Sequence, residues 1–321
     1  MSPEGLLLVD KPPGPTSHDV VDAVRKGLRQ RRVGHAGTLD PFASGLLPLV
    51  LGRATRLVRF LPHAPKTYEG VLRLGTATST DDLTGDIVQR EALPPRNAVL
   101  AAAARFRGRL LQVPPAFSAK RIRGRRMYRL ARAGHAPVAP PSAVEVFRFE
   151  LEPGDGDEDW SFVAEVSAGT YIRALARDLG KELGCGGTLV RLRRVAIGSL
   201  SLDSAIPIPG AGTPPSWERL LAAVIPLEAM PLQLPSLHLD DAALARRFAA
   251  GLAVPCAADA RDGASALFDP AGTLLGVAEV IAGQARPMVV LPGPPGPEEP
   301  VGPRPPRRPR GGRGASAGGG F

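Results

Sequence analysis

The chain is poor in the residues that build disulfide frameworks and zinc sites. Its 321 residues include two cysteines, Cys185 and Cys256, which lie far apart in the sequence. Neither belongs to a CxxC pair or to a Cys/His spacing typical of metal ligands. We therefore expect both to be buried thiols, and no metal site is predicted.

Long hydrophobic runs are also missing. No apolar run approaches the roughly 20 residues needed to cross a bilayer, and the N-terminal residues lack the basic, apolar and small-residue regions of a signal peptide. A hydrophobic content of 44% with 22% charged residues is ordinary for a soluble protein with a core, and excludes a wholly disordered or fibrous chain. We expect a cytoplasmic protein.

Nucleotide-binding motifs and repeats are absent as well. The sequence contains neither GxxxxGK[ST] nor GxGxxG, which argues against a loop that cradles nucleotide phosphates. There is no internal repeat of fixed period, which argues against a solenoid or a propeller.

The sequence has an excess of positive charge. Forty Lys and Arg against 31 Asp and Glu give a formal net charge of +9, and only part of this excess lies in the last thirty residues. A basic chain favours a polyanionic partner, because neutralised phosphates release condensed counterions. Nucleic acid is the partner that this predicts.

Hydrophobic periodicity predicts a largely antiparallel α+β domain, because strands and helices alternate without a regular βαβ rhythm. We expect a buried strand at the opening LLLVD, and a helix capped by Thr16 or Ser17. The other expected strands are 66–75 paired with 86–91, a hairpin of 144–152 with 159–167, and LVRLRR with the residues that follow it; the other expected helices are 97–106 and 169–184.

Two changes of composition suggest the domain limits. The run PIPGAGTPPS at about 207–216 is a loop or linker, and a boundary is expected near 230. Residues 235–291 read as a short helix with Gly-punctuated apolar strands, which would suit a small barrel. Residues 292–321 contain nine prolines and nine glycines and are expected to be a disordered tail.

One unusual stretch is VGHAGTLDPFASGLLPLVLG (33–52), which we interpret as a glycine-flexed loop rather than a helix. It carries His35 and Asp40. Pro41 favours an extended backbone at Asp40, and nearby glycines let the backbone approach a ligand. Asp40 is either a simple turn former or a functional carboxylate.

Tyrosine and arginine supply further candidates. Tyr68 lies in a predicted strand, and Tyr171 and Arg173 lie at the start of a predicted helix; a tyrosine can hold a strand or helix end in place or stack on a base. An arginine can keep a carboxylate ionised. Together with Asp40 these are parts of a nucleobase pocket. The acidic run STDDLTGD (79–86) reads instead as a solvated turn.

The strongest electrostatic feature is a basic block. Seven of the thirteen residues from Lys120 to Arg132 are basic, none is acidic, and Tyr128 lies among them. A block of one sign suits a phosphate backbone better than a solvated helix face, which usually mixes charges.

With these residues the chain resembles the bacterial TruB-type tRNA pseudouridine-55 synthases. Six ordered blocks between about residues 4 and 200 carry the resemblance: LLLVDKPPGPTSHDVV, GHAGTLDPFASGLLPL, KTYEGVLRLG, the basic block with its flanks, GTYIRALARDLG and LVRLRR. The resemblance implies that one uridine in the TΨC stem-loop of tRNA is flipped out and isomerised, without metal or cofactor. It also implies an isomerase that acts as a monomer without an obligate protein partner.

The resemblance also implies roles for single residues. Asp40 matches the catalytic aspartate, acting either as a nucleophile on C1′ or the uracil ring or as the base of a glycal route. Tyr68 matches a pocket tyrosine and Arg173 the arginine that pairs with the aspartate. The matched substrate contacts are His35, Tyr171, Leu192 and Lys11.

The family further implies a division of the chain. Residues 1–230 would form the catalytic domain, with an RNA-clasping insertion at about 113–137 and a PUA-like RNA-binding barrel at 231–291. The implied contacts with the RNA backbone are Lys120, Arg121, Arg123, Arg125, Arg126 and Arg129.

Three other functions were weighed. A related enzyme that acts on other RNA under a guide RNA is disfavoured by the bacterial-style insertion. A tRNA chaperone without chemistry is disfavoured by the intact set of Asp40, Tyr68, Tyr171 and Arg173. A glycosidase would need a second carboxylate across the scissile bond, and the sequence nominates none.

Overall fold

The computed structural model describes residues 2–117, 139–208, 216–257 and 260–293, and the backbone of two short strands at 121–122 and 125–126. Most of the predicted RNA-clasping insertion, the centre of the 207–216 seam and residues 294–321 lie outside the described residues. Across the described ranges no helix is both long and apolar enough to cross a membrane.

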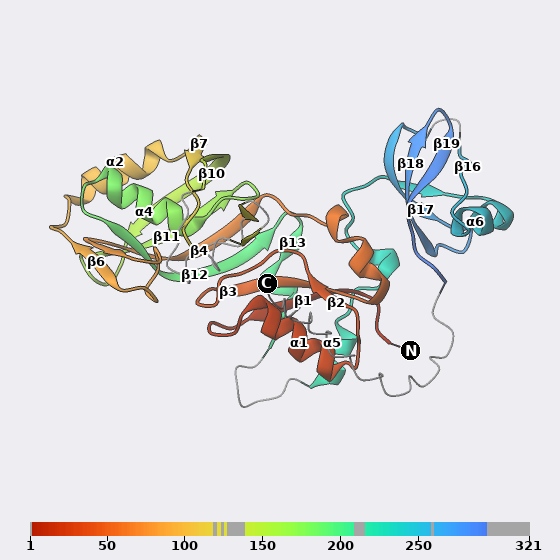
Figure 1. Ribbon diagram of the computed structural model, residues 1–321, viewed down its shortest axis with the longest axis horizontal. Helices are drawn as coiled ribbons and strands as arrows, with labels where there is room; N and C mark the ends of the chain where they lie inside the picture. The colour runs from red at the N-terminus through yellow and green to blue at the C-terminus, as the bar shows by residue number, and fades with distance from the viewer. Residues whose placement is uncertain are drawn as a thin grey trace, which may run out of the picture.

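A large mixed sheet forms the body of the protein (Figure 1). Its main path runs β14, β1, β3, β12, β4, β11, β10, β7, with β2 paired to β3 and β13 paired to β12. Only the β1–β14 and β3–β12 pairs are parallel. The bounds of these strands are β1 Gly5–Lys11, β2 Val33–His35, β3 Ser44–Leu51, β4 Lys66–Leu74, β7 Gly108–Gln112, β10 Ser142–Pro153, β11 Asp159–Val166, β12 Gly187–Ile197, β13 Leu200–Ser201 and β14 Ile206–Pro207.

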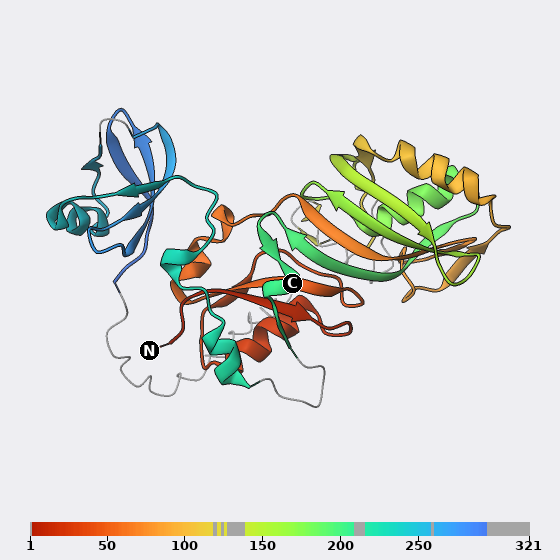
Figure 2. The ribbon, with the colours of Figure 1, turned by 180° about the vertical axis from the view of Figure 1, so that it is seen from behind.

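Helices α4 and α2 lie side by side on one face of this sheet, α4 against β12 and β4 and α2 against β10 (Figures 1 and 2). The helical segments associated with the large sheet and the linker after it are α1 Ser17–Gly27, η1 Gly52–Arg56, η2 Val58–Phe60, α2 Arg96–Arg105, α4 Ile172–Glu182, η3 Leu202–Ser204, α5 Trp217–Ala222 and η4 Leu227–Ala229. The predicted fold class, an α+β protein with a largely antiparallel sheet, is confirmed.

Strand β1 has an unbroken apolar run, Leu6 to Val9, because both of its faces are buried there. Leu7 and Val9 pack into one core with the apolar face of α1, while Leu6 and Leu8 face a second core that extends to the C-terminal sheet. The predicted first helix starts where expected. Thr16 caps it, accepting from the Asp19 amide at 3.1 Å while the Asp19 carboxylate accepts from the Thr16 amide at 2.8 Å.

Two strand predictions need correction. Residues 86–91 do not pair with 66–75, because β11 and β12 already occupy both edges of β4. Gly75, with φ of +80°, turns the chain out of the large sheet, and β6 (Ile87–Arg90) pairs with β5 (Thr76–Thr78) in a separate hairpin. Residues 33–52 are also not all loop, because their apolar ends form β2 and β3.

The C-terminal unit is a second, five-stranded sheet (Figure 1). It shares no strand pairing with the first sheet, but the second core joins the two through residues such as Leu6 and Val277. Its order is β15, β17, β18, β19, β16, and α6 packs against it through Phe248. The bounds are β15 Ser236–His238, α6 Ala242–Ala249, β16 Val254–Pro255, β17 Gly263–Phe268, β18 Leu274–Ile281 and β19 Gln284–Val290. Two short strands, β8 Arg121–Ile122 and β9 Arg125–Arg126, pair with each other in the predicted insertion.

Candidate active site

Asp40 lies in the loop that joins β2 to β3, at the seam where β3 runs parallel to β12. This loop depends on glycines with positive φ at both ends, +118° at Gly37 and +101° at Gly45. A Cβ at Gly45 would lie 2.3 Å from the carbonyl oxygen of Arg194 on β12. Glycine is therefore required at Gly45 both for its backbone conformation and for close approach of the two strands.

Three side chains from distant parts of the chain hold this loop in place. The fully buried Arg194 guanidinium donates to the carbonyl oxygens of Leu46 at 2.8 Å, Gly37 at 3.1 Å and Thr38 at 3.3 Å. Lys11 Nζ donates to three further carbonyl oxygens, those of Ala43 (2.6 Å), Pro12 (2.8 Å) and Pro41 (3.2 Å). Ser17 Oγ exchanges hydrogen bonds with both backbone groups of Leu39.

Arg173 pairs directly with Asp40, as the sequence predicts. Its Nε donates to Asp40 Oδ2 at 2.8 Å, and the arginine side chain is 4% exposed whereas the carboxylate is 36% exposed. The rest of the guanidinium donates to the carbonyl oxygens of Thr80 at 3.0 Å and Phe117 at 2.8 Å. Among the described residues only Arg173 donates to the Asp40 carboxylate, which leaves its other oxygen and a solvent-facing side toward the cavity.

The acidic run 79–86 is a turn, as predicted, and Ser79, Thr84 and Asp86 are exposed, but Asp82 is not solvated. Asp82 is buried, with Oδ2 3.5 Å from Arg173 Nη1, and its Oδ1 accepts from the Thr84 amide at 2.9 Å and from Thr80 Oγ1 at 2.8 Å. The partly exposed Asp40 carboxylate alone does not offset the cost of burying the Arg173 guanidinium. A second carboxylate, that of Asp82, is therefore buried beside it. Asp82 therefore supports Arg173.

Both predicted tyrosines reach the same cavity as Asp40. Tyr68 projects from β4 and is largely buried, and Tyr171 is the residue that precedes α4. The backbone of Tyr171 is held by Gln112 of β7, whose Oε1 accepts from the Tyr171 amide at 2.8 Å and whose Nε2 donates to its carbonyl at 3.1 Å. This contact explains why α4 begins at Ile172 and not at 169.

The cavity encloses about 190 Å³, and five predicted residues line it: Asp40, Tyr68, Tyr171, Arg173 and Leu192. Leu192 supplies an apolar wall from β12. Lys66, at the start of β4, lines it too. Burial, together with repulsion from Arg194, lowers the pKa of Lys66 to about 8.

The structure does not bring every predicted residue into this cavity. Lys11 is completely buried behind the loop, where desolvation lowers its pKa to about 8 although Asp40 acts in the opposite direction. His35 lies on β2 with Nδ1 buried and without a hydrogen-bond partner, and burial lowers its pKa. The side chains of the predicted RNA-backbone residues, Lys120, Arg121, Arg123, Arg125, Arg126 and Arg129, lie outside the described residues.

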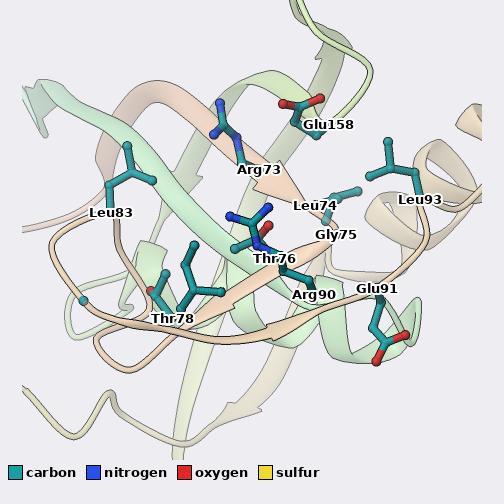
Figure 3. Close-up of a pocket in the computed structure, with 12 residues that line it drawn as sticks. Arg73, Leu74, Gly75, Thr76, Thr78, Leu83, Arg90, Glu91, Leu93 and Glu158 are labelled. Carbon is teal, nitrogen blue, oxygen red and sulfur yellow. The ribbon is translucent and has the colours of Figure 1, made fainter.

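A larger cavity of about 470 Å³ lies beside the β5–β6 hairpin (Figure 3). Leu83 and Leu93 line it together with Arg73 and Arg90. Arg73 forms a bidentate pair with Asp159 at 2.7 and 2.9 Å, so its charge is already balanced. None of the predicted site residues lines this cavity. In the part of the chain that the structure describes, no cluster of three or more His, Cys, Asp or Glu side chains could hold a metal ion.

Sequence reasoning missed four residues of the site: Lys66, Asp82, Gln112 and Arg194. Lys66 could have been found from its position two residues before Tyr68, because alternate strand residues share a face. Arg194 lies in the predicted strand LVRLRR, and its burial is set by the β3–β12 seam. Gln112 and Asp82 gave no local signal, since their roles depend on segments far away in the sequence.

Known proteins are similar to this chain. The model of the TruB family pseudouridylate synthase (N terminal domain) matches residues 25–172. The tRNA pseudouridine synthase B of Synechococcus sp. is 42% identical over 302 residues, which covers 91% of this chain and 99% of that protein. The enzyme of the same name from Acaryochloris marina is 41% identical over 294 residues, which covers 90% of this chain and 99% of that protein.

Solved structures are also similar. A chain of a Cbf5-Nop10-Gar1 complex superposes with a TM-score of 0.62 at 29% identity, covering 86% of this chain and 78% of that chain. A chain of an H/ACA RNP bound to a substrate RNA containing 2′-deoxyuridine gives a TM-score of 0.61 at 27% identity, with the same coverage. From the identity over nearly its full length, and from the geometry around Asp40, this chain belongs to the TruB family of pseudouridylate synthases.

Proposed function

We propose that this protein isomerises the uridine at position 55 in the TΨC stem-loop of tRNA to pseudouridine. The observation that carries the proposal is the half-exposed Asp40 carboxylate, paired with Arg173, in a cavity that two tyrosines and an apolar side chain share. Full-length relatives at 41–42% identity bear the name tRNA pseudouridine synthase B. The more distant Cbf5 neighbours come from protein complexes.

The size of the cavity is consistent with a single flipped base. At about 190 Å³ it is smaller than the roughly 300–1,000 Å³ of sites for drug-sized ligands, so it takes one base rather than a stretch of nucleic acid. A uridine inside a folded loop has to leave its stack before a carboxylate can reach it, at a cost of a few kcal/mol. Stacking on a phenol ring and burial against Leu192 offset that cost.

The reaction needs no co-reactant. The bond from C1′ to N1 breaks, the uracil turns within the cavity, and a bond from C1′ to C5 forms; C5 then loses its proton and N1 gains one. Asp40 is the catalytic carboxylate, acting either as the nucleophile that bonds to the nucleoside or as the base that starts a glycal route. Tyr68 lies where it can stack on the base and accept the C5 proton.

Arg173 has two tasks in this scheme. Its guanidinium pairs with the Asp40 carboxylate and fixes its orientation toward the cavity. Because the same guanidinium also holds the carbonyls of Thr80 and Phe117, it joins the aspartate loop to the root of the predicted insertion. Tyr171 is presented at the start of the same helix.

We propose that other parts of the chain contribute affinity rather than chemistry. The insertion at about 113–137, which contains the basic block, would grip the tRNA backbone. Residues 231–291 would form a PUA-like RNA-binding domain beside the catalytic domain of residues 1–230. The enzyme would act as a monomer without a guide RNA. Light scattering of the purified protein with and without tRNA tests the oligomeric state.

The test of function is direct. Purified protein is incubated with an unmodified tRNA transcript in the presence of a chelator and without guide RNA, and pseudouridine is mapped along the RNA. We expect modification at position 55 alone. Modification only after addition of a guide RNA would instead support the guided reaction, and tight binding without modification would support a chaperone.

A further inference from the structure

Lys66 differs from the other lysine at the site in having no partner. It starts β4 and lies two residues before Tyr68, so that both side chains share one face of the strand and line the cavity with Asp40. Lys11 Nζ is held by three carbonyl oxygens. Within the described part of the chain, Lys66 Nζ has neither a hydrogen bond nor an ion pair.

The surroundings of Lys66 do not balance its charge. The charged side chain that acts on it is Arg194, which is also positive and which lowers the lysine pKa further than burial alone. The carboxylate across the cavity, Asp40, is already paired with Arg173. With a pKa of about 8 the ammonium group is still mostly protonated at neutral pH. The cavity therefore holds a cation without a counter-ion, which is unfavourable until an anion arrives.

An RNA substrate brings one kind of anion to this place. The base and the ribose of a flipped uridine are neutral, and each neighbouring internucleotide phosphate carries one negative charge. A lysine ammonium is a compact charge with three donors and binds phosphate without demanding a planar geometry. The phosphate is thus the group of the substrate that offsets the unpaired charge of Lys66.

We propose that Lys66 binds the backbone phosphate next to the flipped uridine and so holds the nucleoside against Asp40. This proposal rests on the proposed function. Lys66 is then a substrate-binding residue that contributes affinity for the extruded nucleotide. Its role differs from that of Tyr68, two residues later in β4.

A double-mutant cycle between protein and RNA tests the contact. Two stem-loop RNAs each carry a single neutral methylphosphonate, at the 5′ or the 3′ phosphate of the target uridine. Dissociation constants are measured for two proteins, one with Asp40→Asn alone and one with Asp40→Asn and Lys66→Met. The Asp40 substitution is present in both so that no turnover occurs. Because both proteins carry it, the comparison between them isolates the contribution of Lys66.

We expect Lys66→Met to weaken binding of unmodified RNA about 10- to 100-fold, the range for a hydrogen bond to a charged group. One of the two methylphosphonates should weaken RNA binding by the same factor in the protein that keeps Lys66. The same methylphosphonate should leave binding to the Lys66→Met protein unchanged. The proposal fails if each methylphosphonate weakens RNA binding equally in the two proteins, or if neither methylphosphonate weakens binding at all. Lys66 would then not contact a flanking phosphate.

Stability and controls separate this contact from a structural role. Lys66→Met removes an unpaired, partly buried cation, so its Tm at pH 7 should be no lower than that of the wild type. Between about pH 8 and pH 10.5, Lys66 loses its proton in the folded protein but keeps it in the unfolded chain. The free energy of unfolding of the wild type therefore rises over this range, and any higher stability of Lys66→Met disappears. Lys66→Arg should retain most of the affinity, and Lys181→Met at the exposed end of α4 should change nothing. Because the cycle measures binding, its outcome is independent of whether pseudouridine forms.

Discussion

Arg173 and Asp40 form an asymmetric pair: the arginine is almost completely buried, and the carboxylate that it holds at 2.8 Å faces the cavity. Such a pair does not act mainly as a source of stability, because the desolvation of the arginine offsets much of the attraction. It orients one carboxylate oxygen and leaves the other for a substrate. The remaining donors of the arginine are used on the backbone of Thr80 and Phe117.

The first prediction concerns Asp40. Replacing it with asparagine keeps an oxygen that can accept from Arg173 Nε but removes the negative charge. We expect pseudouridine formation to fall by at least about 10²- to 10⁴-fold, with tRNA affinity changed no more than about threefold. Single-turnover assays and filter binding measure the two quantities. Asp157→Asn, at an exposed position, is the control; turnover retained by the Asp40 variant would remove the carboxylate from the mechanism.

The second prediction concerns Arg173. Arg173→Met leaves Asp82 buried without its cation and removes the donors to Thr80 and Phe117, so we expect a loss of about 3–5 kcal/mol in the free energy of unfolding together with loss of activity. Arg173→Lys should recover part of the stability and little of the activity, because a single ammonium cannot reach all these acceptors. Arg193→Lys, at a half-exposed pair with Asp10, should cost less than about 1 kcal/mol. Equal effects of the Arg173 and Arg193 variants in chemical denaturation would contradict this account.

The third prediction concerns Gln112, whose side-chain amide hydrogen-bonds the backbone of Tyr171. Gln112→Leu leaves the Tyr171 amide without its acceptor, at a cost of about 1–3 kcal/mol. We expect a lower Tm and a raised KM for tRNA, because the tyrosine ring is no longer held at the cavity. Gln112→Glu keeps an acceptor for the amide and should lose less stability than Gln112→Leu. The control is Gln89→Leu on the exposed strand β6; a similar KM for both leucine variants would argue against a positioning role.

The fourth prediction concerns Gly45. Gly45→Ala adds a Cβ that would lie 2.3 Å from the Arg194 carbonyl and also places alanine at a φ of +101°. Gly272→Ala shares the positive φ, at +81°, but has open space around the new Cβ. We expect about 1–2 kcal/mol of destabilisation from backbone conformation in the control, and a larger loss, with loss of turnover, at Gly45. Equal Tm values for the two variants would show that β3 and β12 can separate at no cost.

The fifth prediction concerns the basic block. Neutralising Arg123, Arg125 and Arg126 to glutamine should weaken tRNA binding and reduce the slope of log K against log salt concentration by roughly one unit for each phosphate that the protein no longer binds. The same change at Arg304, Arg307 and Arg308 alters net charge equally and serves as the control. A slope that falls equally in both triple variants would show a net-charge effect and not a local interface.

Much of the catalytic half could be predicted from the sequence because its signals are local. The capped first helix, the hairpin of β10 and β11, and the α4 pattern each depend on residues within one turn or one strand. The residues around Asp40 were predicted together because the motifs carry the resemblance. Five of those named then met at one cavity, from elements up to 152 positions apart in the case of Asp40 and Leu192.

The remainder depends on long-range packing, which local patterns do not report. Asp82 looked solvated because its neighbours are polar, and only the buried Arg173 explains its position. The pairing of 86–91 was wrong because the occupancy of both edges of β4 is a property of the whole sheet. Lys11 resembled a substrate contact, yet its three carbonyl partners place it beneath the loop.

The tethers of the Asp40 loop have a practical consequence for truncation. A fragment cut to the limits of the matched family model, 25–172, would keep the aspartate and both tyrosines. It would lose Lys11, Ser17, Arg173 and Arg194, which are the side chains that fix the loop and its carboxylate. Catalytic competence should therefore emerge late in synthesis, only after β12 has left the ribosome and inserted between β3 and β4, so that a nascent chain short of that strand cannot modify RNA.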